Sequence, residues 1–177
     1  GSWSARWRDV VAARLPRTAW PERALQLVAV DARTAEPVVF DRESGIDLID
    51  AVAASCSSGF PYGIGENRYL DGGYRRSSEN ADLAAGYGRV LVLSPFGGRS
   101  RAPEEWGMAL AAQAEELRAG GSRVEAILPD GRSLEAFGDD MMDLSRRAPA
   151  ARAGYDQGSA LAGPLGEFWG DRTPSGS

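Results

Sequence analysis

The sequence of 177 residues contains no histidine and no lysine, so all 20 of its basic residues are arginines. Without histidine the chain cannot form a Ser-His-Asp triad, an H-E-x-x-H zinc site or the His-Cys zinc site of nucleobase deaminases. Without lysine it has neither a Schiff-base amine nor the lysine of a phosphate-binding P-loop. The chemistry open to these residues therefore depends on carboxylates, hydroxyls, backbone amides and arginine.

Cysteine and long apolar runs are also scarce. Cys56 is the only cysteine, which excludes an internal disulfide and a cysteine zinc site. No run reaches the roughly 18 apolar residues of a membrane helix, and no signal-peptide pattern opens the chain, so we expect a cytoplasmic protein without a transmembrane segment. The net charge of −5 argues against nucleic acid as a partner.

The length fits one ordinary domain spanning residues 1–177. Gly1 and Ser2 resemble a remnant of cloning, and residues 171–177 form a polar tail that we expect to be flexible. Between these ends, patterns typical of strands and helices alternate. This alternation predicts an α/β fold, with a layered sheet and helices on both of its faces.

Hydrophobic periodicity and turn residues predict the individual elements. We expect helices at Trp3–Leu15, at Leu48–Cys56, from Pro103 to a stop at Gly120-Gly121, and at Pro149–Trp169. We expect strands at Leu25–Val30, Glu36–Phe40, Arg68–Leu70, Arg89–Leu93 and Val124–Leu128, the first two as antiparallel neighbours, and a loop at Ser57–Asn67.

Two of the helices carry more detailed predictions. Ser44 and Asp47 form a capping-box pattern ahead of the second helix. Cys56 falls on the apolar face of that helix, which favours a packed core thiol over a nucleophile. In the third helix, the residues expected to face the core are Trp106, Leu110, Ala114 and Leu117.

Two motifs that bind phosphates in other proteins have simpler explanations here. Residues 139–143 (DDMMD) match the pattern that binds magnesium diphosphate in isoprenoid synthases, but the chain lacks the second acidic motif and the all-helical pattern of those enzymes. We interpret these residues as an acidic helix start or loop. The glycines at 63–65 and 97–98 complete no nucleotide-binding pattern and are explained by turns.

Asp71 is the carboxylate whose position is most informative. It ends a predicted strand and precedes Gly72 and Gly73, so neighbouring backbone can approach closely while the side chain points out of the sheet edge. Asp-Gly is also among the commonest turn dipeptides. The spacing alone leaves both a catalytic carboxylate and an ordinary turn open.

An ordered set of features runs through Ala51–Pro95: a helix ending in Ala-Ser-Cys, a Gly/Pro loop, a strand leading into Asp-Gly-Gly, then Asn80-Ala81-Asp82 and a hydrophobic strand. In this order they resemble the C-terminal catalytic segment of bacterial patatin-like phospholipases. Trp20–Asp41 and Arg146–Gly158 also resemble stretches of the actinobacterial branch of that family. The resemblance covers most of the chain and implies the C-terminal part of a patatin-like fold.

The resemblance implies serine esterase chemistry without histidine and without a metal or organic cofactor. Members of the family hydrolyse lipid or other acyl esters with a Ser-Asp dyad. The serine lies on a G-x-S-x-G elbow, and the aspartate of the Asp-Gly-Gly motif, here Asp71, is its base. A glycine-rich loop near the family's N-terminus supplies the backbone N–H groups that stabilise the oxyanion.

The sequence departs from the family in two respects, the first being that no glycine-rich oxyanion loop precedes Asp71. No G-x-S-x-G occurs in it, and the nearest candidates, Ser57 in SCSSG and Ser159 in GSALAG, break the pattern. We therefore expect the chain to supply the base of a lipid acyl hydrolase, with an N-terminal half bearing the nucleophile as its partner. The alternative is a truncated, non-catalytic α/β interaction module, which leaves open whether the chain is an enzyme.

Overall fold

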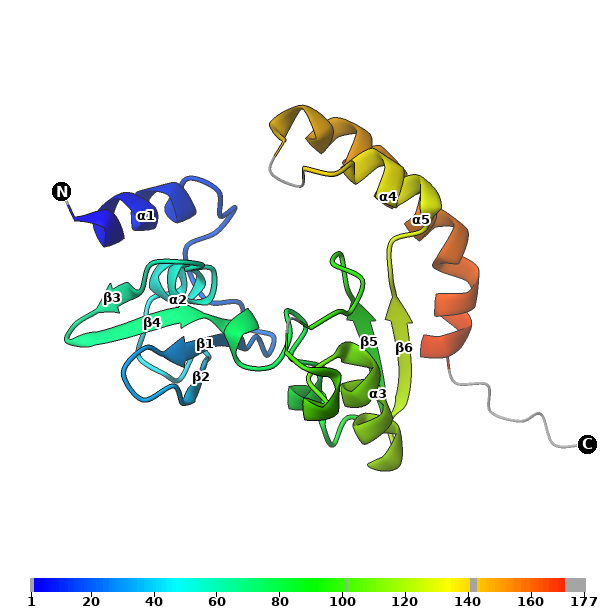
Figure 1. The fold of residues 1–177 in the computed structure, drawn as a ribbon, viewed down its shortest axis with the longest axis horizontal. Helices are drawn as coiled ribbons and strands as arrows, with labels where there is room; N and C mark the ends of the chain where they lie inside the picture. The colour runs from blue at the N-terminus through cyan, green and yellow to red at the C-terminus, as the bar shows by residue number, and fades with distance from the viewer. Residues whose placement is uncertain (1, 101, 141–142, 171–177) are drawn as a thin grey trace, which may run out of the picture. The chain divides into compact units, whose positions relative to one another are not determined.

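The computed structural model describes residues 2–100, 102–140 and 143–170 (Figure 1). These residues group into two compact units, the first within 1–83 and 98–116 and the second within 84–97 and 117–177. Of the expected cloning remnant, Gly1 lies outside the described residues, and so does the expected flexible tail. Ser2 caps the first helix, because its Oγ accepts a hydrogen bond from the N–H of Ala5 at 3.3 Å.

The first unit contains a four-stranded antiparallel sheet in the order β2-β1-β4-β3. Its strands are β1 (Leu27–Asp31), β2 (Pro37–Phe40), β3 (Tyr62–Ile64) and β4 (Asn67–Asp71). The predicted β1–β2 hairpin is confirmed, and its turn is closed by Asp31, whose carboxylate accepts the N–H groups of Arg33 and Thr34 at 2.8 and 3.1 Å. On its other side β1 pairs with β4, which places Asp71 opposite Ala29.

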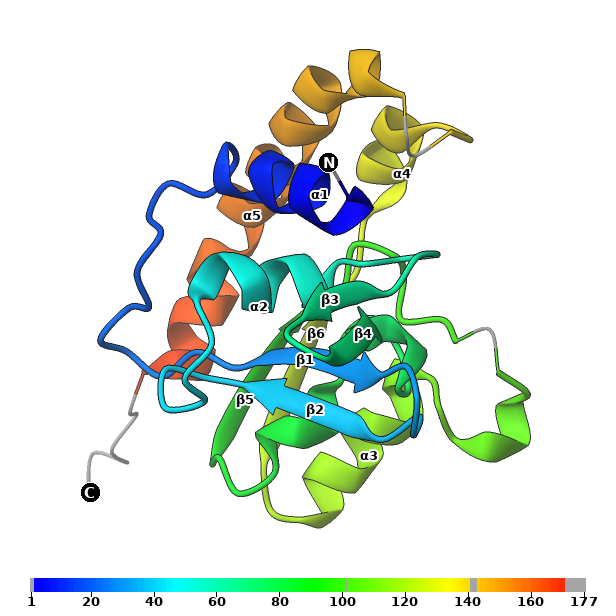
Figure 2. The same cartoon turned by 90° about the vertical axis from the view of Figure 1, so that its left-hand side faces the viewer.

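Helices α1 (Trp3–Ala12) and α2 (Leu48–Ser55) complete the core of this unit. α2 contacts β1 and β4, and three of its alanines, Ala51, Ala53 and Ala54, are fully buried. Such small side chains let a helix approach a sheet closely. α1 lies over α2 (Figure 2), where the indole N–H of Trp7 donates to the carbonyl of Ala53 at 2.9 Å.

The start of α2 differs from the predicted capping box. Asp47 is the N-cap residue, but its side chain makes no capping hydrogen bond and instead pairs with Arg8 at 3.3 Å. Ser44 closes the preceding turn by hydrogen bonding to the backbone of Asp41. The prediction was wrong because both side chains find partners outside the helix terminus.

The predicted loop Ser57–Asn67 also contains a strand that the sequence pattern did not show. β3 has only three residues and includes Gly63, so it is too short for a period-two signal. Its formation depends on pairing with β4, where Tyr62 lies opposite Tyr69 and is 2% exposed. The Tyr62 hydroxyl donates to Asp50 of α2 at 2.6 Å.

The second unit is built on the parallel strands β5 (Arg89–Leu93) and β6 (Arg123–Ile127), with Arg89 opposite Arg123. Helices α4 (Gly131–Phe137) and α5 (Arg147–Trp169) pack against each other after β6. Gln157 of α5 donates to the carbonyl of Leu128 at 2.7 Å and accepts from Ser133 at 2.9 Å. Helix α4 was not predicted from the sequence; it spans only two turns and is capped by Asp130.

The helix expected from Pro103 onward forms two separate pieces. Residues Glu104–Trp106 make a 3₁₀ turn, η3, and α3 begins only at Leu110 and ends at Ala119. Gly107 lies between them with φ of 60°, a left-handed conformation that ends the first turn. Trp106 is consequently 62% exposed and not in the core, whereas Leu110, Ala114 and Leu117 are buried as predicted.

Three further 3₁₀ turns complete the described elements: η1 (Gly72–Tyr74), η2 (Ala81–Ala84) and η4 (Leu144–Arg146). The mixed α/β class predicted from the sequence is confirmed, but the described strands form two sheets and not one layered sheet. The single domain over residues 1–177 and the patatin-like topology stay predictions. None of the described helices is long and apolar enough to span a membrane.

Replacing Gly72 by alanine should destabilise the protein. A Cβ atom at Gly72 would lie against the carbonyl of Val28, 2.8 Å from its carbon, and backbone cannot give way as a flexible side chain can. We expect the free energy of unfolding, measured by urea titration, to fall by about 1–3 kcal/mol.

The control for that measurement is Gly158→Ala. Gly158 lies within α5, and a Cβ there would meet nothing within 4 Å. Alanine favours a helix interior over glycine by about 0.5–1 kcal/mol, so this variant should gain stability. Equal stabilities of Gly72→Ala and the parent protein would contradict the packing described for the end of β4.

Candidate functional site

Asp71, the candidate base, is the last residue of β4 and the N-cap residue of η1. Its Oδ1 accepts the N–H of Gly73 at 2.8 Å, and its own N–H donates to the carbonyl of Ser57 at 3.1 Å. The side chain is half-buried, and the described residues place no hydrogen-bond donor on Oδ2. One carboxylate oxygen is thus fixed by the backbone while the other is open to accept a proton.

Ser57 has a structural role beside Asp71. It is 1% exposed, and its Oγ lies within hydrogen-bond distance of the carbonyl oxygens of Ala54 (2.8 Å) and Tyr69 (3.0 Å). The hydroxyl therefore ties the end of α2 to β4. Because its hydrogen points to backbone carbonyls, Ser57 does not have the exposed hydroxyl of an elbow nucleophile, and Ser159 is an exposed residue of α5 in the second unit.

Cys56 is not the packed core thiol that the apolar spacing predicted. α2 ends at Ser55, so Cys56 becomes its C-cap residue and is exposed. The surrounding protein nevertheless desolvates the sulfur, and this desolvation, together with the negative charge of Asp71, raises the pKa of the thiol above its ordinary value. The thiol is protonated at neutral pH, which argues against a nucleophilic role, in agreement with the sequence-based interpretation.

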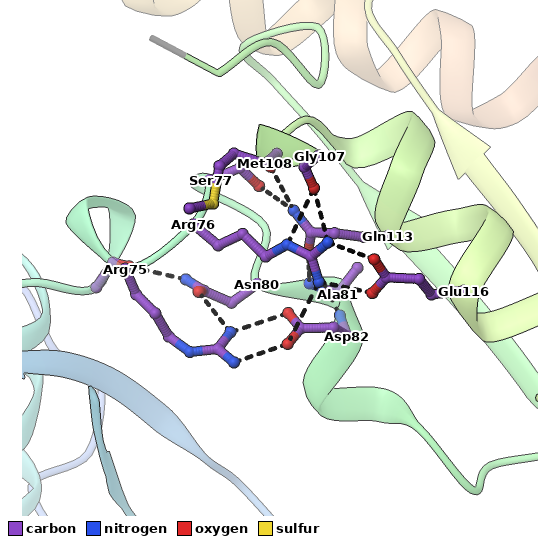
Figure 3. A network of polar contacts seen from close by, with 11 residues as sticks. Arg75, Arg76, Ser77, Asn80, Ala81, Asp82, Gly107, Met108, Gln113 and Glu116 are labelled. Carbon is purple, nitrogen blue, oxygen red and sulfur yellow. Dashed lines mark hydrogen bonds and ion pairs between the residues drawn. The ribbon is translucent and has the colours of Figure 1, made fainter. Parts of the chain in front are cut away.

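A network of polar contacts holds the loop that follows Asp71, residues 72–82 (Figure 3). Arg75 binds both carboxylate oxygens of Asp82, at 2.9 and 2.7 Å, and so closes the loop on itself. This pairing lowers the pKa of Asp82 and raises that of Arg75. Arg75 also donates to Oδ1 of Asn80 at 3.1 Å, and Nδ2 of Asn80 donates to the carbonyl of Gly72 at 3.0 Å.

Gln113 of α3 fastens the same loop from a second element. Its side chain is 0% exposed, and Oε1 accepts the N–H groups of Ala81 and Asp82 at 2.7 and 3.4 Å. Its Nε2 donates to Oγ of Ser77 at 2.8 Å and to the carbonyl of Met108 at 2.9 Å. All four hydrogen-bonding positions of this carboxamide are thereby used, as a buried amide requires.

Arg76 adds an ion pair at the edge of the network. Its guanidinium binds Glu116 of α3 at 2.7 and 2.5 Å and the carbonyl of Gly107 at 2.6 and 3.2 Å. The hydrogen bonds from Arg76 lower the pKa of Glu116. Because the Glu116 side chain is 55% exposed, this pair contributes little to stability compared with the buried amide.

This network was not predicted from the sequence. The available signal was Gln113 itself, a polar residue on the helical face that also carries the buried Leu110, Ala114 and Leu117. A polar side chain on such a face must find partners within the fold. Nothing local in the sequence indicated that those partners would lie in the loop after Asp71.

The acidic segment 139–143 is described only in part. Met141 and Met142 lie outside the described residues, and the Asp143 carboxylate accepts the N–H of Ser145 at 2.8 Å as the cap of η4. Among the residues that the structure describes, no group of three or more carboxylate, cysteine or histidine side chains is arranged to hold a metal ion.

Comparison of the chain with models of protein families and with curated proteins found no match.

Replacing Asp71 by asparagine should make the Cys56 thiol more acidic. The carboxylate opposes formation of the nearby thiolate, so removing its charge lowers the thiol pKa and raises the thiolate fraction at any pH below that pKa. Because Cys56 is the only cysteine, the pH profile of iodoacetamide alkylation reports this site alone, and its midpoint should move to lower pH.

Asp143→Asn serves as the control for this titration, since the carboxylate of Asp143 caps η4 and is not among the charges that act on Cys56. Its alkylation profile should match that of the parent protein. An unchanged midpoint in Asp71→Asn would mean that the carboxylate and the thiol are not neighbours in solution.

Proposed function

We propose that this chain supplies the general base, Asp71, of a serine-type hydrolase that cleaves lipid or other hydrophobic acyl esters. The observation that carries the proposal is the state of the Asp71 carboxylate: one oxygen is fixed by the Gly73 N–H at 2.8 Å, and the other receives no donor from the described residues. The resemblance of Ala51–Pro95 to the catalytic segment of patatin-like phospholipases points to the same residue.

The reaction that fits this base is acyl transfer through a covalent intermediate. Oδ2 of Asp71 takes the proton of a serine hydroxyl while the serine oxygen bonds to the ester carbonyl carbon. Collapse of the tetrahedral intermediate breaks the ester bond and releases the alcohol, which receives that proton. Water then attacks the acyl-serine by the same route, with Asp71 again as base, and the carboxylic acid leaves.

In this proposal the nucleophile and the oxyanion donors come from a segment that bears G-x-S-x-G, since the 177 residues contain no such elbow. The residues of this chain contribute the base and the turn that holds it. No histidine is needed as the base, because a carboxylate of fixed orientation can accept the serine proton directly. The Ser-Asp arrangement is thus compatible with a sequence that has no histidine at all.

The proposal predicts that Asp71→Asn abolishes most ester hydrolysis when the chain is fused to, or co-expressed with, the G-x-S-x-G half of a patatin-like hydrolase. Asparagine has nearly the same shape and can still accept the Gly73 N–H, but it cannot take up the serine proton. The rate with an activated acyl ester such as a p-nitrophenyl ester should fall by about 10²- to 10⁴-fold.

Asp143→Asn is the matched control for this experiment. Its carboxylate also accepts the N–H of the residue two positions later at 2.8 Å, so the two substitutions perturb the same kind of turn. The control should keep its activity within a few-fold. If Asp71→Asn kept its activity as well, Asp71 would not be the base, and the non-catalytic interaction module would be favoured.

A further inference from the structure

We propose that Asn80 is a positioning residue for Asp71 and that it acts through the peptide group between Gly72 and Gly73. The carbonyl oxygen of this peptide group belongs to Gly72 and accepts the Asn80 side-chain amide at 3.0 Å. Its N–H belongs to Gly73 and donates to Oδ1 of Asp71 at 2.8 Å. A single planar unit therefore connects the two side chains.

This connection fixes the direction in which the Gly73 N–H points. A peptide plane between two glycines turns easily, because no Cβ restricts the neighbouring torsions. A hydrogen bond to its carbonyl on one edge opposes that rotation, so the N–H on the other edge stays directed at the carboxylate. Hydrogen bonds arranged in series also polarise one another, which strengthens the bond to Asp71.

Asn80 is itself held in place by the fold. It is 7% exposed, and its backbone has φ of 46°, in the left-handed region that asparagine tolerates better than most residues. Its Oδ1 accepts from Arg75, which also holds Asp82. The N–H of the next residue, Ala81, is bound by the buried Gln113. Arg75 thus holds the side chain of Asn80, and Gln113 holds the backbone directly after it (Figure 3).

The connection from Asn80 through the Gly72–Gly73 peptide group to Asp71 can be tested by NMR spectroscopy of the full chain. The Gly73 amide proton, followed by NMR, should move with pH as the carboxylate that it binds is protonated, and Asp71→Asn should abolish that movement. In Asn80→Gly, glycine keeps the left-handed backbone but has no side-chain amide. The amplitude of the pH-dependent shift of the Gly73 amide proton should then fall by about half or more, because hydrogen bonds weaken steeply once their alignment is lost.

Two further variants make this test decisive. Asn80→Ala also lacks the side-chain amide and adds no group that takes up a proton in this pH range, so it should lose amplitude as Asn80→Gly does. Glu116→Gln removes a partner of Arg76 elsewhere in the network and should leave the amplitude unchanged. A full amplitude in folded Asn80→Gly would overturn the proposal. Loss of folding in both Asn80 variants would also overturn it, since Asn80 would then support the whole unit.

The catalytic meaning of this role rests on the proposed function and is measured separately. In the reconstituted hydrolase, Asn80→Gly should lower kcat by about 10- to 100-fold, the effect of a misplaced catalytic group, and leave KM unchanged. If the activity fell by the same factor through a higher KM, with kcat unchanged, that result would contradict a positioning role. If the parent protein shows no hydrolysis, the proposed function fails, while the Gly73 titration still decides whether Asn80 orients Asp71.

Discussion

The close contact between Gly72 and the backbone of Val28 is the constraint on which the rest of the site depends. It brings the chain against the start of β1 directly after Asp71, in a space that admits no Cβ atom. The next peptide group is then presented with its N–H toward Asp71 and its carbonyl toward Asn80. Backbone packing thus places this peptide group, and the hydrogen bond from Asn80 then fixes the direction of its N–H toward the carboxylate.

The loop from Gly72 to Asp82 could not keep this orientation on its own, because it contains only short 3₁₀ turns. Buried polar groups supply the rigidity that regular secondary structure supplies elsewhere. Gln113 is the most costly of these groups to remove. Truncating its side chain would leave several buried donors and acceptors unsatisfied, at about 1–3 kcal/mol each. A charge pair of modest exposure, Arg75 with Asp82, then closes the loop across seven residues.

Features with a local signal could be predicted from the sequence, and those that depend on distant partners could not. Apolar spacing located α1, α5 and the β1–β2 hairpin, and the Asp-Gly-Gly triplet placed Asp71 at a strand end. β3 exists only through its pairing with β4, and Cys56 is exposed because α2 ends one residue before it. Gln113 and Ser77 are 36 residues apart, so no local pattern connects them.

The central claim is that Asn80 orients Asp71 through the Gly72–Gly73 peptide group, and a double-mutant cycle between the two residues tests it most directly. Both side chains form a hydrogen bond with this peptide group, which connects them. The free energies of unfolding of Asp71→Ala, Asn80→Gly, the double variant and the parent protein are measured by urea titration. Transmission through the shared peptide group predicts a coupling energy of about 0.5–3 kcal/mol. Additive effects within about 0.3 kcal/mol would contradict it, because independent sites behave in that way.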